Sequence, residues 1–244
     1  MAVSRRNVTS GQDVGSSSSC TFSPTKPTGT VDGDLIRVFF SADGLASGGT
    51  VTASPSGWTT IFSPIQSTAD GQWLHGWEKV ASSEPASWSW TVTIATANVL
   101  TWAVISHTGQ DATYEDVTPV TTINNTAAAS VVSVALSGLT TVTDGCMLLW
   151  VAAGDPNTNN TGSFTEPSGF TAGVNLYSNF APLIVCDKAQ GTQGATGTLT
   201  GLLSFASGGA GFVGVVIAIR PLAAAAAYLE DTLHRPSMMA ILAQ

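Results

Sequence analysis

The sequence predicts an all-β fold: an antiparallel β-sandwich or jelly roll built from two similar halves, followed by a short C-terminal helical tail. The first reason is an internal repeat, because Asp32-Gly33 and Asp144-Gly145 each precede an apolar run (145 − 33 = 112). The same offset carries Pro55 to Thr59 onto Pro167 to Thr171 without a gap. The second reason is that short apolar or alternating segments recur between Gly- and Pro-rich turns, as they do in sandwiches and barrels.

Residues 1–21 are polar and Ser-rich, and we expect a flexible N-terminal arm there. Residues 22–221 are predicted to form the β-sandwich domain, with halves at about 22–110 and 126–221. Leu35 to Ser41 shows little alternation, so both faces of that strand are expected to be covered. The strands predicted in the first half are Leu35–Ser41, Thr50–Ala53, Trp58–Phe62, Trp73–Ala81, Trp88–Ala95 and Val99–Ser106.

A polar, turn-rich stretch at 111–125 is expected to connect the halves across the surface. The strands predicted in the second half are Val131–Leu136, Met147–Ala153, Phe170–Tyr177, Leu183–Lys188, Thr196–Leu202 and Phe212–Ile219. No helix is predicted before Pro221. The pattern leaves open whether the halves form one sandwich or two. One sandwich is favoured because Leu35 to Phe40 and Met147 to Val151 are apolar on both faces and need neighbours.

The C-terminal tail, residues 222–244, differs in kind. Leu222 to Leu233 is Ala-rich and helix-forming, and His234, Arg235 and Pro236 end the predicted helix. An isolated helix of this length is marginal in water, so the tail is expected to bind a surface. The predicted partner-docking residues are Tyr228, Leu229, Leu233, Met238, Met239, Ile241 and Leu242.

Composition excludes several classes of function. Charged residues make up 10% of the chain, against about 25% in ordinary domains, so Thr, Ser, Gly and Asn must supply most of the polar surface. The net charge of −8 opposes phosphate binding, and nucleic acid is not expected as a partner. The three cysteines are too few for a disulfide scaffold. The longest apolar run, Phe212 to Ile219, is too short to span a bilayer, so no membrane partner is expected.

Catalytic and metal-binding patterns are not found. The three histidines, His75, His107 and His234, lack metal-ligand spacing, and no nucleophile elbow, P-loop or dinucleotide motif occurs. The acids available for a hydrolytic pair are Glu78, Glu84, Glu115 and Glu166, but their spacing selects no pair. Asp-rich loops contain oxygen ligands for calcium, although Asx turns explain the same residues. The sequence therefore predicts no enzyme, no catalytic residues, no metal and no cofactor.

The positions of the tryptophans bear on whether these strands form a packed core or a sugar-binding surface. Trp73 and Trp77 share one face of their predicted strand, and Trp88 and Trp90 share a face of theirs. The offset of the internal repeat is 109 in this region (186 − 77 = 109), which places Trp77 opposite Cys186 in a core-like run. A core role is therefore favoured over an aromatic platform for glycans.

A set of segments carries a resemblance to a known group of proteins. They are Asp32 to Leu35, Pro55 to Thr59, Trp77 to Ala81 and Ala218 to Pro221. Together they resemble tailed-bacteriophage virion proteins with β-sandwich folds, which serve as capsid decoration (cement) proteins or as tail and fibre components. The resemblance covers roughly residues 22–221 and implies a non-enzymatic structural role with self-association. It transfers no functional residue.

The expectation is therefore a virion protein assembled in the host cytoplasm, a capsid decoration protein that binds the head surface. Its expected partners are the major capsid protein or another virion protein, together with further copies of itself as a homo-oligomer. The alternative is a carbohydrate- or receptor-binding module of a phage tail or fibre. A glycosidase is a third hypothesis, which would need two facing carboxylates in a cleft.

Overall fold

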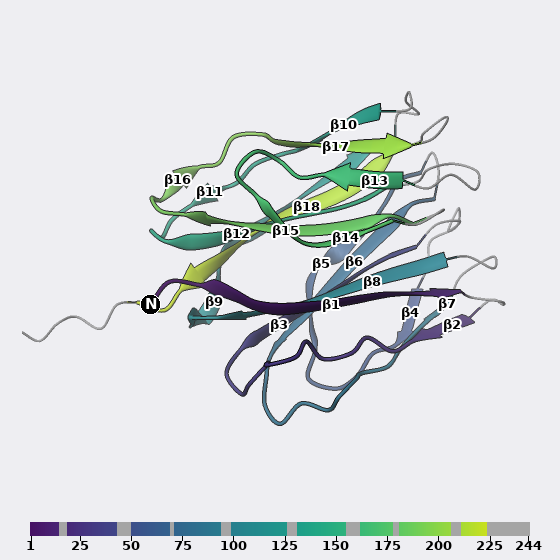
Figure 1. Cartoon of the computed structure of the whole chain (residues 1–244), viewed down its shortest axis with the longest axis horizontal. Helices are drawn as coiled ribbons and strands as arrows, with labels where there is room; N and C mark the ends of the chain where they lie inside the picture. The colour runs from purple at the N-terminus through teal and green to yellow at the C-terminus, as the bar shows by residue number, and fades with distance from the viewer. Residues whose placement is uncertain are drawn as a thin grey trace, which may run out of the picture.

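Antiparallel strands make up the fold in the computed structural model, which describes residues 1–14, 19–42, 50–68, 71–93, 99–125, 131–154, 162–177, 181–205 and 211–223. Within these ranges there is no helix, and every strand pairing is antiparallel (Figure 1). The predicted all-β, antiparallel class is confirmed. Leu222 and Ala223, the first two residues of the predicted C-terminal helix, are not helical, and the rest of that helix lies outside the described residues.

Two five-stranded sheets form the middle of the molecule. The first has the order β1 (Ser4–Val14), β8 (Val99–Thr108), β3 (Leu35–Ala42), β6 (Trp73–Val80), β5 (Thr59–Gln66). The second has the order β14 (Thr171–Leu176), β15 (Leu183–Gln190), β12 (Cys146–Gly154), β18 (Phe212–Pro221), β9 (Gln110–Asn124). The sheets face each other with β1 against β14 and β5 against β9.

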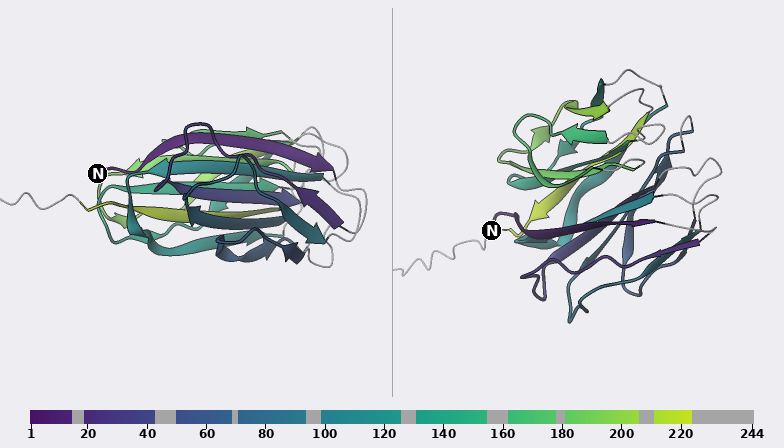
Figure 2. Two further views of the ribbon diagram at one scale, coloured as in Figure 1. Left: turned by 90° about the horizontal axis from the view of Figure 1, so that it is seen from below. Right: turned by 45° about the vertical axis from the view of Figure 1, so that its right-hand side comes forward.

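A smaller sheet covers the outer face of each five-stranded sheet, which gives four layers (Figures 1 and 2). The first five-stranded sheet and its outer sheet make up the first part of the molecule, and the second five-stranded sheet and its outer sheet make up the second part. The outer sheet of the first part has the order β2 (Ser19–Phe22), β7 (Trp90–Thr93), β4 (Thr50–Ala53). That of the second part has the order β10 (Val131–Leu136), β17 (Leu199–Phe205), β13 (Gly162–Thr165), and β11 (Thr140–Thr141) pairs with β16 (Gly194–Ala195).

Three apolar clusters fill the spaces between the layers. The middle cluster joins the two five-stranded sheets and includes Phe39 from the first and Leu149 from the second. The other two clusters each lie between a five-stranded sheet and its outer sheet. All residues of β3 and β12 are buried, because alternate side chains of each strand enter the middle cluster and an outer cluster. The expectation that both faces of these strands are covered is confirmed.

The structure corrects the prediction of a flexible N-terminal arm. Residues 4–14 form β1, which pairs with β8 along its length, and Ser19–Phe22 form β2. The expected flexible arm is therefore wrong for these segments. Backbone pairing at a sheet edge stabilises β1 despite its polar sequence, and Val3 and Val8 pack on the middle cluster.

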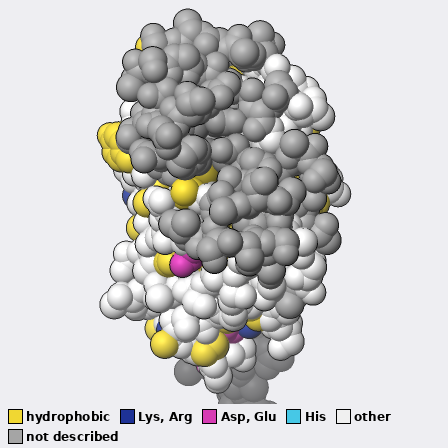
Figure 3. Space-filling model, turned by 90° about the vertical axis from the view of Figure 1, so that its right-hand side faces the viewer, with side chains coloured by type: hydrophobic (Ala, Val, Ile, Leu, Met, Phe, Trp, Pro, Cys, Tyr) yellow, Lys and Arg dark blue, Asp and Glu magenta, His cyan; other side chains and the backbone are white. Residues whose placement is uncertain are grey.

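The expected connection at 111–125 is also wrong, since Gln110–Asn124 form the long edge strand β9. Pro119 in β9, like Pro64 in the edge strand β5, is compatible with a strand because an edge does not need every N–H for pairing. The short strands β2, β11, β13 and β16 were not predicted, and β17 begins at Leu199 rather than Thr196. At the end of the molecule where β10 begins, charged side chains are sparse among the described residues (Figure 3).

Candidate functional site

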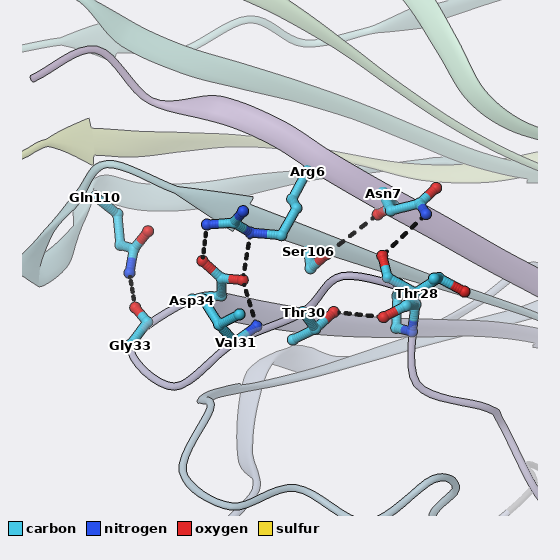
Figure 4. Close-up of polar contacts among 10 residues, drawn as sticks. Arg6, Asn7, Thr28, Thr30, Val31, Gly33, Asp34, Ser106 and Gln110 are labelled. Carbon is cyan, nitrogen blue, oxygen red and sulfur yellow. Dashed lines mark hydrogen bonds and ion pairs between the residues drawn. The ribbon is translucent and has the colours of Figure 1, made fainter.

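The turn Val31 to Asp34, which belongs to the repeated motif, is held by side chains of both edge strands β1 and β9 (Figure 4). Asp34 is buried, and its carboxylate pairs with Arg6, with Nε and Oδ2 2.6 Å apart. The same carboxylate accepts a hydrogen bond from the Val31 N–H at 2.9 Å. Gln110 donates to the Gly33 carbonyl oxygen. These contacts make the turn a structural junction between the strands.

Other aspartates in turns also accept backbone hydrogen bonds. Asp32 Oδ1 accepts from the Ser83 N–H at 2.7 Å, and Asp144 Oδ1 accepts from the Gln193 N–H at 2.7 Å. Among the described residues, no group of three or more His, Cys, Asp or Glu side chains could hold a metal ion. The turn-stabilising interpretation is favoured for these aspartates. Of the loop acids that could offer calcium ligands, Asp111 and Asp116 are described and accept hydrogen bonds from the backbone N–H groups of Thr113 and Val142. Asp43, Asp70 and residues 155–160 lie outside the described residues.

The tryptophans are packed in the interior. Trp73, Trp77, Trp88 and Trp90 are all buried, at 6% exposure or less, which confirms the predicted core role. Trp58 is half-buried and meets Trp88 and Trp90 edge-on, with ring centroids 5.1 Å apart in each pair. None of these rings forms a platform on which a sugar could stack.

The two described histidines, His75 and His107, are buried in strands β6 and β8. Burial lowers the pKa of His75 to about 3, and neither of its ring nitrogens has a hydrogen-bond partner among the described residues. His107 lies between the five-stranded sheets, 3.7 Å from Asp187 (Nε2 to Oδ2). Burial lowers the pKa of His107, although the Asp187 carboxylate opposes that change. Neither histidine has the partners of a metal ligand.

Charged side chains gather at one end of the middle cluster. Arg37 and Glu78 form a buried ion pair, with Nη2 and Oε2 2.7 Å apart. Arg5 Nη1 lies 3.5 Å from Asp187 Oδ2 and so connects β1 to β15. Arg5 and His107 both approach Asp187 and so join the first five-stranded sheet to the second, whereas the Arg37–Glu78 pair joins β3 to β6 within the first sheet. Their arrangement indicates a structural role.

A cavity of about 370 Å³ opens at the seam between β5 and β9. Glu78, Tyr114 and Glu115 line it, so the structure brings together two of the acids that sequence spacing could not pair. Burial raises the pKa of Glu115, and the charge of Glu78 raises it further. Glu78 is bound to Arg37, which ties its carboxylate to β3. No local signal foretold this pairing, which depends on β9 docking beside β5.

A larger groove, of about 800 Å³, lies where β1 begins and β18 ends. Its rim carries three exposed apolar side chains, Met1 at 72% exposure, Val142 at 58% and Leu222 at 46%. Polar side chains, including Asp144 and Arg220, line the rest of the groove. Sequence reasoning did not single out these residues, because they come together only through the ends of separate strands.

The predicted docking residues of the tail lie outside the described residues; Leu222 and Ala223, which precede them in the sequence, line the groove. The docking residues are Tyr228, Leu229, Leu233, Met238, Met239, Ile241 and Leu242. Within the described part of the chain, no helix is long and apolar enough to cross a membrane. No protein-family model, curated protein or solved structure matches this chain, so the resemblance to bacteriophage virion proteins stays a prediction.

Proposed function

We propose that this chain is a non-enzymatic structural protein of a tailed-bacteriophage virion, a capsid decoration protein that binds the head surface and self-associates. The observation that carries the proposal is that the sheet is complete where the apolar tail starts. β18 is paired by β12 on one side and β9 on the other, and the Leu222 N–H donates to the Gly109 carbonyl oxygen at 2.8 Å. The apolar residues after Ala223 are thus not needed to finish the sheet, and burial against a partner would stabilise them.

The proposed scaffold is a duplicated jelly roll. The two five-stranded sheets support it, because their strands are arranged in the same way relative to their order in the chain: β1-β8-β3-β6-β5 and β9-β18-β12-β15-β14. The two outer sheets also match each other, as β2-β7-β4 and β10-β17-β13. Leu35 pairs with His107 in the first part, and Met147 pairs with Ile219 in the second, which keeps the offset of the repeat (147 − 35 = 219 − 107 = 112). The buried, layered interior suits a protein that must stay rigid on a particle surface.

The test is incorporation into particles. We expect mass spectrometry of purified virions to find the full chain in many copies per particle. A chain that ends at Ala223 should keep its β-sheet circular dichroism spectrum and yet be missing from the particles. A full-length chain with Val131→Lys, an exposed position at 54%, serves as the control and should be incorporated normally. Incorporation of the shortened chain at the normal level would refute the docking role of the tail.

The carbohydrate- or receptor-binding alternative lacks a specific observation in its favour. It requires exposed aromatic rings beside polar loops. Six of the seven tryptophans are buried and the remaining one, Trp58, is half-buried against other rings. A glycan array probed with the full chain would revive this alternative only if it detected binding that tryptophan substitutions abolish.

A further inference from the structure

The groove between Met1, Val142 and Leu222 has the features of an acceptor for an apolar segment. Nine large apolar side chains are substantially exposed in the described chain, and these three of them meet around the groove. Its volume of about 800 Å³ falls within the roughly 300–1,000 Å³ of typical binding pockets. Exposed apolar side chains that gather beside polar ones are a usual mark of an interaction surface.

The groove is preformed, because its walls are tied by hydrogen bonds. Met1 N donates to the Leu222 carbonyl oxygen at 2.8 Å, and the Val142 N–H donates to Asp116 Oδ2 at 2.7 Å. The Gly145 N–H donates to the Gly191 carbonyl oxygen at 3.1 Å. These three backbone hydrogen bonds hold the rim in place, so its apolar side chains are presented to a partner by a fixed backbone.

We propose that this groove binds the C-terminal tail of a second copy of the same chain, with Leu229 and Leu233 as the anchoring side chains. This inference rests on the proposed docking role of the tail and names its partner. The tail supplies apolar side chains at helical spacing, since Leu229 and Leu233 are four residues apart and share a helix face. An amphipathic helix that lays such a face into an apolar groove is a common mode of recognition.

A second copy is a better acceptor than the tail's own groove. Leu222 and Ala223 belong to the wall of the groove, so the tail starts at the rim of its own site. If the predicted helix starts after Ala223 and runs to Leu233, it would be about 15 Å long and would carry its anchors away from that rim. Pro236, one of the residues predicted to end this helix, follows both anchors in the sequence. Each copy therefore contains one donor and one acceptor, which suits a closed oligomer.

The test uses two full-length variants, each defective in one half of the contact. Val142→Lys places a charge in the groove and keeps the backbone hydrogen bond to Asp116. Leu229→Asp with Leu233→Asp removes the anchors and leaves the groove intact. Val131→Lys is the matched control, because Val131 is exposed to a similar extent, 54% against 58% for Val142, and does not line the groove. Sedimentation velocity at micromolar concentration reports the mass of each species.

We expect the unchanged chain and Val131→Lys to sediment as oligomers and each defective variant to dissociate at least about tenfold more readily. An equimolar mixture of the two defective variants should form a heterodimer, since one still offers a groove and the other a tail. A mixture that stays monomeric, or an oligomer that Val142→Lys does not weaken, would overturn the inference. A monomeric unchanged chain whose tail is needed in virions would also overturn the inference; it would remove self-association from the proposed function and leave its binding to the head standing. If the two defective variants form heterodimers but the unchanged chain is not found in virions, only the proposed function is refuted.

Discussion

The ring of His75 packs on Trp77, with centroids 3.6 Å apart, and is surrounded by Phe40 and Trp73 in the first outer cluster. Burial there lowers its pKa to about 3, far below the ordinary histidine value of 6.5. The unfolded chain takes up a proton as the pH falls below 6.5, whereas the folded chain takes it up only near 3. The free energy of unfolding is therefore reduced by His75 across this window, and the reduction is complete below pH 3.

Replacing this histidine should make the free energy of unfolding fall less steeply as the pH is lowered. We expect His75→Phe to reduce the loss of stability between pH 7 and pH 5 by roughly 1–2 kcal/mol, measured as urea midpoints at the two pH values. His107 is a second buried histidine with a lowered pKa, so part of the acid sensitivity should persist in the variant. An unchanged difference between the two midpoints would show that His75 is solvated or partnered in the folded chain.

Residue-level predictions from the sequence succeeded where local pattern determines burial. Alternation placed Trp88 and Trp90 on one face of a strand segment, and both are buried. The local sequence pattern did not predict which residues of different strands contact each other. Arg37 meets Glu78 only because β3 and β6 pair in a register that sets these two residues opposite each other. Such contacts depend on long-range pairing, which one sequence without its fold does not specify.

At the level of elements, β1 shows how an edge strand is fixed by its neighbour. Gly11 lies opposite Trp102 of β8, and a Cβ atom at position 11 would collide with the Trp102 ring. The indole Nε1 of Trp102 donates to Asp13 Oδ2 at 2.9 Å, so the ring is held across β1. The missing side chain at Gly11 thus provides the space in which this ring lies.

Gly11→Ala is expected to destabilise the protein by about 1–3 kcal/mol, because the Trp102 ring must leave a packed position. Urea unfolding followed by tryptophan fluorescence would measure the change. Gly191→Ala is the matched control, since a Cβ there meets no atom within 4 Å. Equal midpoints for Gly11→Ala and the unchanged chain would mean that β1 is loosely attached, as the sequence had led us to expect.

The elements missed by the sequence share a physical cause. β1 and β9 are edge strands, and each pairs through its backbone with only one neighbour in its sheet. Their side chains are largely polar and lack a regular apolar period, which is the signal that identified the central strands. β3 and β12, by contrast, are apolar on both faces because they are covered on both sides, and their bounds were predicted to within a residue.

At the scale of the whole molecule, the middle cluster determines whether the two parts unfold together. Phe39 from β3 and Leu149 from β12 are both fully buried in it, along with Val185 and Val215. Each five-stranded sheet is thus apolar on both of its faces, and separation of the parts would expose one face of each. The cost of exposing that surface should couple the two parts into one cooperative unit.

Phe39→Ala tests this coupling, since it leaves a hole in the shared cluster and should destabilise the protein by about 3–5 kcal/mol. If the parts are coupled, native-state hydrogen exchange should quicken by the same factor in β7 of the first outer sheet and in β17 of the second, although no residue of β17 belongs to the middle cluster. Val131→Ala, at an exposed position, should leave both rates unchanged. Faster exchange confined to the first part would mean that its sandwich opens alone, and that the middle cluster is an interface between two independently stable bodies.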